Sequence, residues 1–99
     1  MTNLFVILVK YEKDLKVIDE ILPHHRAYLK LGYESGKLLA SGPQNPKIGG
    51  VIIGKFESRE EALAFTQNDP YALQNAASYQ IIEFNPVLHQ DFLNNFLEA

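Results

Sequence analysis

The 99-residue chain contains no cysteine. Disulfides, thiol nucleophiles and cysteine-ligated zinc or iron–sulfur sites are therefore excluded, and the composition is compatible with a reducing compartment. The longest apolar run, residues 4–9, is far shorter than the roughly 20 residues that a membrane span needs. The N-terminal residues also lack the charged region and small-residue cleavage site of a signal peptide. These absences predict a cytoplasmic protein with no membrane partner.

Charge of either sign is not concentrated anywhere in the chain. Nine Lys and Arg stand against twelve Asp and Glu, which gives a net charge of −3, and the basic residues are scattered. Nucleic-acid binding calls for a basic stripe, so we expect no nucleic-acid partner. The hydrophobic content of 46% is typical of a folded globular chain. A chain of this length corresponds to one domain, which we expect to span residues 1–99.

Four segments have the composition of β-strands: residues 4–9, 37–41, 50–56 and 78–84. The first and third are apolar on both faces, which is typical of central strands covered on both sides. The fourth has one polar face. We therefore expect the first and third strands to lie in the middle of a sheet.

Helical spacing of apolar residues separates and follows these strands. Residues 15–22 predict a short helical segment, which Pro23 should end or kink before opening the main helix. Ser58 followed by Glu61 has the capping-box form and predicts a second helix that ends before Asp69. The tail from Val87 to Ala99 carries Leu88, Phe92, Leu93 and Phe96 on one side. It predicts an extra C-terminal helix that docks on the domain or on a partner.

The resulting order of elements, β-α-β-β-α-β, predicts an α+β fold. Short connections and right-handed crossovers favour the ferredoxin-like βαββαβ sandwich, with a four-stranded antiparallel sheet in the order 4-1-3-2. That order places the two strands that are apolar on both faces in the middle. Both helices then cover one face of the sheet, and a bare apolar face normally marks an interface. We expect a homodimer that forms through the open sheet face.

In this topology three polar segments meet at one end of the sheet. They are the predicted helix start with His24 and His25, the end of the second strand at residues 41–43, and the end of the second helix at residues 68–69. A carboxylate beside a histidine fixes the tautomer of the imidazole and prepares the free ring nitrogen as a general base or acid. We therefore expect His25 to pair with Asp69.

Purely structural alternatives remain open for the same residues. Asp69 followed by Pro70 is typical of a helix start, with Asp as the cap. His25 fits equally well as a core histidine with a satisfied hydrogen bond. Residues 41–43 are most often a simple turn, and tyrosines such as Tyr28 more often form pocket walls than act as acids.

Metal and nucleotide sites are not predicted. Adjacent histidines on a helix point about 100° apart and rarely share one ion, and His89 is remote in sequence. No HExxH, GxGxxG or GxxxxGK[ST] motif occurs.

Four segments follow the pattern of a known family: Pro23-x-His25-x-x-Tyr28-Leu29, Gly36-Lys37-Leu38-Leu39-Ala40-Ser41-Gly42-Pro43, Glu60-Glu61-Ala62 and Asn68-Asp69-Pro70-Tyr71. In their order and spacing they resemble the YciI-like (YCII-related) proteins, over nearly the whole chain. The resemblance implies a dimeric α/β-barrel subunit in which His25 and Asp69 form the active-site pair and Ser41 lies in the same pocket. Related proteins include a dehydrochlorinase that acts on a chlorinated hydroxyquinol and muconolactone isomerase. Many relatives have an arginine where this chain has Leu22, so a cation for an anionic substrate is missing there.

The leading hypothesis is a cofactor-free lyase, isomerase or dehydrochlorinase-like enzyme. His25 would transfer a proton on a small cyclic substrate, and Asp69 would orient it. Ser41 and the backbone at Gly42 would hold a substrate oxygen. The remaining expected substrate-binding residues, which would line the pocket or its rim, are Tyr28, Tyr71 and His24.

Two other hypotheses compete with the enzyme. One is a non-catalytic module that binds a small ligand or a partner, in which the His25–Asp69 pair only ties two helices together. The other is a haem or metal binder that uses His25 or His89.

Overall fold

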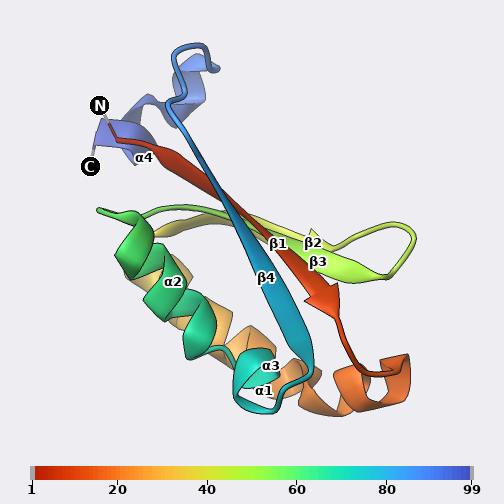
Figure 1. The fold of residues 1–99 in the computed structure, drawn as a ribbon. Helices are drawn as coiled ribbons and strands as arrows, with labels where there is room; N and C mark the ends of the chain where they lie inside the picture. Colours follow the sequence, from red (N-terminus) through yellow and green to blue (C-terminus); the bar gives the residue numbers. More distant parts are fainter. Residues whose placement is uncertain (1, 99) are drawn as a thin grey trace.

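The computed structural model describes residues 2–98, whose elements form one βαββαβ unit followed by short C-terminal turns (Figure 1). Their bounds are β1 (Leu4–Tyr11), α1 (Leu15–Glu34), β2 (Leu38–Pro43), β3 (Gly49–Lys55), α2 (Arg59–Gln67), α3 (Pro70–Leu73), β4 (Ala77–Phe84), a 3₁₀ turn η1 (Asp91–Leu93) and α4 (Asn94–Glu98). All four strands lie in one antiparallel sheet with the order β2-β3-β1-β4. This is the predicted order read from the opposite edge, so the ferredoxin-like fold is confirmed.

The register of the sheet sorts its side chains onto two faces. Ile7 lies opposite Ile52 on β3 and opposite Ile81 on β4, and this row faces the helices. The next row, with Val6 between Ile53 and Ile82, faces the other way, because successive side chains of a strand alternate. Both rows are apolar, as the sequence of the central strands indicated.

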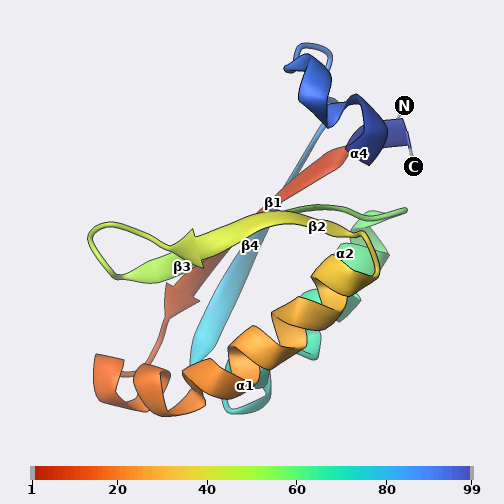
Figure 2. The ribbon, with the colours of Figure 1, turned by 180° about the vertical axis from the view of Figure 1, so that it is seen from behind.

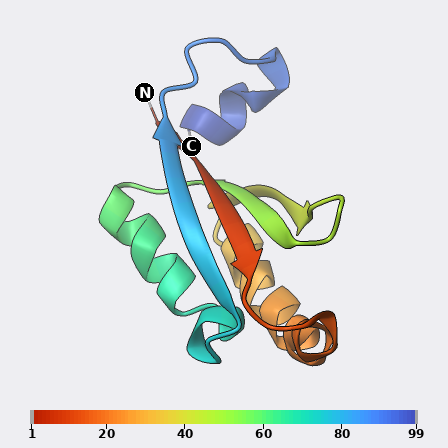
Figure 3. The same ribbon diagram turned by 45° about the vertical axis from the view of Figure 1, so that its right-hand side comes forward.

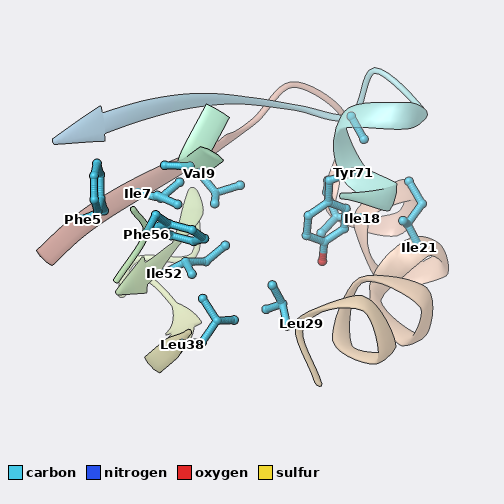
Figure 4. Close-up of a cluster of buried hydrophobic side chains, with 12 residues drawn as sticks. Phe5, Ile7, Val9, Ile18, Ile21, Leu29, Leu38, Ile52, Phe56 and Tyr71 are labelled. Carbon is cyan, nitrogen blue, oxygen red and sulfur yellow. The ribbon is translucent and has the colours of Figure 1, made fainter. Parts of the chain in front are cut away.

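Helices α1, α2 and α3 all lie on one face of the sheet, and the core fills the space between the two layers (Figures 1 and 3). Inward side chains of β1 and β3 meet apolar side chains of α1 and the ring of Tyr71 from α3 (Figure 4). The best-buried large side chains are Tyr71, Phe5, Ile7, Ile18, Ile52 and Asp69. Asp69 is the one carboxylate in this set, so a charged group sits at the edge of an apolar core.

Helix α1 differs from the prediction in where it begins. It starts at Leu15, because the Asp14 side chain caps it by accepting a hydrogen bond from the backbone N–H of Val17 at 3.1 Å. Pro23 lies inside the helix and does not open it. It removes one backbone hydrogen bond, and Figure 2 shows α1 bending after its first turns. His25 is therefore near the middle of a long helix, and the predicted helix start at Pro23 is wrong.

The second helical region follows the prediction more closely. Ser58 caps α2 by accepting from the backbone N–H of Glu61 at 3.0 Å, and α2 ends at Gln67. Asp69 then caps α3, a four-residue helix with Pro70 at its first position. The two helices are thus separated by a short turn that fixes the place of Asp69.

The C-terminal region contains the expected helix, but it is shorter than predicted. Residues 91–93 form η1 and residues 94–98 form α4, in which Leu97 is buried. The Lys55 ammonium lies 4.6 Å from the centre of the Phe96 ring and donates a hydrogen bond to the Phe96 carbonyl. In contrast, Leu88 and Phe92 are 90% and 80% exposed, so of the two expected docking sites this chain does not provide one for them. Ala99 lies outside the described residues.

Within residues 2–98, no helix has both the length and the apolar character needed to cross a membrane.

Candidate active site

The site is built on a contact between α1 and the cap of α3. His25 Nδ1 lies 2.8 Å from Asp69 Oδ1. The Asp69 side chain is 1% exposed and that of His25 is 12% exposed. Because a carboxylate oxygen can only accept, Nδ1 carries a hydrogen and donates a hydrogen bond to Oδ1. The expected pairing of these two residues, 44 positions apart, is present in the structure.

The same carboxylate oxygen also has a structural role. Asp69 Oδ1 accepts the backbone N–H of Tyr71 at 3.1 Å, which is the cap of α3. The helix cap and the hydrogen bond to His25 are therefore both present on Asp69. Because one oxygen accepts from both donors, the position of His25 is tied to the start of α3.

Stacking holds the imidazole from a second direction. The His25 and Tyr71 rings are stacked, with centroids 4.1 Å apart and planes inclined by 21°. Tyr71 in turn meets the Tyr11 ring edge-on at 5.9 Å and is 1% exposed. The orientation of His25 is thus set by both a hydrogen bond and a buried aromatic wall.

A cavity of about 210 Å³ lies beside His25, between α1 and the sheet. Its apolar walls come from both layers of the fold, and include Val9, Ile18, Leu22, Leu29 and Ile52. His25 lines it as well. The Nε2 atom has no hydrogen-bond partner among residues 2–98 and is not among the buried unpartnered atoms. The free nitrogen of the dyad is therefore accessible beside a cavity.

Polar and charged side chains line the same cavity. Arg26 and Asp19 come from α1, and Lys47 comes from the loop between β2 and β3. The Lys47 ammonium lies 3.6 Å from Asp19 Oδ1, and both side chains are about half exposed. This ion pair connects the loop to α1 beside the cavity. The cavity thus combines an apolar wall with two cations and one anion.

The end of β2 contributes as the topology predicted. Ser41, Gly42 and Pro43 all line the cavity. The Ser41 hydroxyl is 2.7 Å from the Tyr33 hydroxyl of α1, and either can donate. Ser41 can therefore offer a donor to a bound molecule while it accepts from Tyr33.

Two expected pocket residues lie elsewhere. Tyr28 donates its hydroxyl to the Phe65 carbonyl at 2.6 Å and stacks on the Phe65 ring, so it ties α1 to α2. His24 is exposed on α1 and is not part of the cavity wall. His24 is adjacent to His25 and so points about 100° away around α1, whereas Tyr28 is held against α2 by its contacts with Phe65.

The tyrosines near Asp69 are strongly biased toward the neutral form. Burial, then the nearby Tyr11 hydroxyl and the Asp69 carboxylate, raise the pKa of Tyr71 to about 12. Burial and the Asp69 carboxylate also raise the pKa of Tyr79, and to a smaller extent that of Tyr28. At neutral pH these hydroxyls are hydrogen-bond donors and carry no charge.

Several site residues were missed by the sequence analysis. Arg26 follows His25 directly, and Lys47 lies in a segment interpreted only as a turn, so neither had a recognisable pattern. Tyr11 and Tyr79 continue the inward rows of β1 and β4, and this alternation was the available signal. Arg26 and Lys47 thus place cations at the cavity, although position 22 is a leucine.

No group of three or more His, Asp or Glu side chains within residues 2–98 is arranged to hold a metal ion. His89 lies in the exposed C-terminal segment, where its Nδ1 contacts the Gln90 carbonyl at 3.0 Å. No described acidic or imidazole cluster therefore surrounds either His25 or His89 in the way a metal centre requires.

Comparison with known proteins was consistent with this architecture. The family model described as YCII-related domain matches residues 3–85. The Protein YciI of Escherichia coli O6:H1 (strain CFT073) is 32% identical over 77 residues, which is 67% of this chain and 76% of that protein. The Protein YciI of Shigella flexneri matches to the same extent.

A solved structure shares the fold. It is 5-chloro-2-hydroxyhydroquinone dehydrochlorinase (TftG) from Burkholderia phenoliruptrix AC1100 in complex with 2,5-dihydroxybenzoquinone. The TM-score is 0.71 at 24% identity, over 83% of this chain and 93% of that chain. The segment after residue 85, with η1 and α4, lies beyond the match to the family model.

The tyrosine environment predicts a loss of stability at high pH. An unfolded tyrosine ionises near pH 10, whereas the pKa of Tyr71 in the folded protein is about 12. Between these values the unfolded state releases a proton that the folded state retains, so the free energy of unfolding falls as the pH rises from about 10 to about 12. Urea unfolding at stepped pH should show this fall, and it should be shallower in Tyr71→Phe. An equal slope in both proteins would contradict the assignment.

Proposed function

The chain belongs to the YCII-related domain family, and on that premise we propose that it is a small-molecule enzyme in which His25 transfers a proton. The observation that carries this proposal is that the two nitrogens of the His25 ring have different surroundings. Nδ1 is held by Asp69 at 2.8 Å, whereas Nε2 is unpartnered among the described residues at the wall of a cavity. A general base needs a fixed tautomer and a free nitrogen within reach of the substrate.

Asp69 would assist the transfer without touching the substrate. When Nε2 accepts a proton, the imidazole becomes a cation, and the buried carboxylate at 2.8 Å stabilises that charge. The hydrogen bond to the Tyr71 backbone and the stacked ring keep both partners in place, so little reorganisation accompanies the step. The proton can later return from Nε2 to another atom of the substrate, which is the requirement for both eliminations and isomerisations.

The cavity favours a substrate of one ring that carries oxygen substituents. Its volume of about 210 Å³ suits a molecule of that size, and its apolar walls suit a flat ring. Ser41 and the backbone at Gly42 would bind a substrate oxygen, and Arg26 and Lys47 would favour one that is anionic. The dehydrochlorinase that shares the fold acts on a chlorinated hydroxylated ring, as its name states, and this supports a lyase or isomerase as the first class to test.

One observation favours a non-catalytic function as the second candidate. Asp69 Oδ1 already caps α3, so the contact with His25 joins α1 to α3 whether or not any reaction occurs. In that case the cavity would bind a small ligand without converting it. Proton transfer to a bound molecule separates the two candidates.

Deuterium incorporation tests the proposed proton transfer. We expect the protein to accelerate the exchange of ring hydrogens of 2,5-dihydroxybenzoquinone, or of another hydroxylated one-ring probe, in D₂O as followed by NMR. His25→Gln should lose about 100- to 10,000-fold of this acceleration, which is the usual contribution of a general base. His24→Gln is the matched control, because His24 is the neighbouring residue on α1 and lies outside the cavity. Binding of the probes without any exchange would instead support the ligand-binding alternative.

We also propose that the protein forms a homodimer through the outer face of the sheet. Helices α1–α3 cover the other face, and α4 covers one end of the outer face, where Lys55 contacts Phe96. The rest of the outer face is apolar: Val6, Leu8, Val51 and Ile53 are half-buried, and Ile82 and Phe84 are 41% and 42% exposed. Packing two such faces about a two-fold axis would remove them from water.

Val6→Arg places a charge at the centre of the proposed interface. We expect size-exclusion chromatography with light scattering to show a dimer for the unmodified protein and a monomer for this variant. Leu31→Arg is the control, because Leu31 is 61% exposed on α1, away from the sheet face. A dimer that survives Val6→Arg, or an unmodified protein that is monomeric, would contradict the proposal.

A further inference from the structure

The buried polar atoms that lack a partner gather at one place in the described chain. They are Asp69 Oδ2, the Tyr71 hydroxyl and the Tyr79 hydroxyl. A buried polar group without a hydrogen bond carries a desolvation cost, so folded proteins rarely keep one unless it has a role. All three belong to the dyad carboxylate or to tyrosines whose ionisation it influences. The lack of hydrogen-bond partners is therefore a property of the candidate active site.

Asp69 uses its two oxygens unequally. Oδ1 accepts from His25 Nδ1 and from the Tyr71 backbone, whereas Oδ2 accepts from no described atom. A carboxylate held by one oxygen alone can still rotate about its last torsion, which is a soft one. A donor to Oδ2 would prevent that rotation and keep Oδ1 aimed at His25.

The tyrosines around Asp69 differ in their freedom to act as that donor. The Tyr28 hydroxyl on α1 already donates a hydrogen bond to the Phe65 carbonyl. Tyr71 from α3 presents its backbone to the carboxylate, and its hydroxyl is also influenced by Tyr11, Asp19 and Arg26. Tyr79 remains: it lies on the inner face of β4 opposite Val9, and Asp69 is the largest electrostatic influence on its hydroxyl.

We propose that Tyr79 is a positioning residue, whose hydroxyl donates to Asp69 Oδ2 and thereby holds the carboxylate that orients His25. The three side chains come from β4, the cap of α3 and α1, so the proposed series of hydrogen bonds runs from the sheet to the long helix. For catalysis this inference rests on the proposed proton transfer, but the proposed contact requires no substrate. The neutral state of Tyr79 is consistent with donation, because burial and the Asp69 carboxylate raise its pKa.

Tyr79→Phe tests the proposal because it removes the hydroxyl and keeps the ring. With ¹⁵N-labelled histidine, the exchange of the His25 Nδ1 proton with water can be measured by NMR in the absence of any ligand. We expect exchange to become about tenfold faster or more, together with a lower melting temperature, since a bond to a charged acceptor is lost. If the Tyr79 hydroxyl were unpartnered, its removal would relieve a cost: the melting temperature would stay or rise, and the exchange would not change. That result would overturn the proposal.

Tyr28→Phe provides the matched control. It removes a tyrosine hydroxyl near the same carboxylate, but one that donates to Phe65. It should lower the melting temperature and leave the exchange of the His25 proton unchanged. In an active protein, Tyr79→Phe should also lower kcat with little change in KM. Because exchange is measured on the resting protein, an inactive protein can still confirm the role of Tyr79. An active protein with unaltered exchange would overturn that role alone.

Discussion

The Asp69 carboxylate is the group on which the rest of this structure depends. It belongs to a residue that is 0% exposed and lies at the edge of an apolar core. Burying such a group is unfavourable unless partners surround it. Its partners come from two helices: the backbone N–H at the start of α3 and the imidazole of α1. The need to satisfy one carboxylate therefore determines how α1 and α3 meet, and it leaves an imidazole with one nitrogen held and the other available.

The fold explains why a cavity lies beside that nitrogen. In a βαββαβ unit the end of β2, the middle of α1 and the turn after α2 reach the same end of the sheet. The helix layer and the sheet diverge there, and the residues that line the space come from both. The apolar walls are a continuation of the core, whereas Arg26, Asp19 and Lys47 come from surface positions. A site of mixed polarity thus arises where the core reaches the solvent.

Much of this could be predicted from sequence because it depends on patterns of burial. The order of elements predicted the strand order, the two-sided apolar strands agreed with it, and topology predicted that His25, Ser41 and Asp69 meet. The start of α1 could not be predicted, since Asp14 caps the helix and packing against the sheet outweighs the lost hydrogen bond at Pro23. Tyr28 lies outside the cavity wall because its hydroxyl and ring contact Phe65 on α2, and that contact has no local signature in the sequence.

The remaining parts of the site depend on side-chain contacts that have no local signature. Lys47 faces Asp19 across 3.6 Å, although a turn gives no sign of which helix residue it will meet. The proposed link between Tyr79 and Asp69 would join a strand to a helix cap ten residues earlier, and an inward tyrosine on a strand is ordinarily a core residue. Such contacts follow from the three-dimensional arrangement of elements, which the sequence indicates only in outline.

The protonation of the His25 ring tests the account most directly. At a pH where the imidazole is neutral, ¹⁵N NMR distinguishes the nitrogen that carries hydrogen from the one that does not. The account predicts hydrogen on Nδ1 and a bare Nε2 whose resonance moves when a ligand enters the cavity. A ring with hydrogen on Nε2 would show that Asp69 does not orient it, and would contradict the central claim.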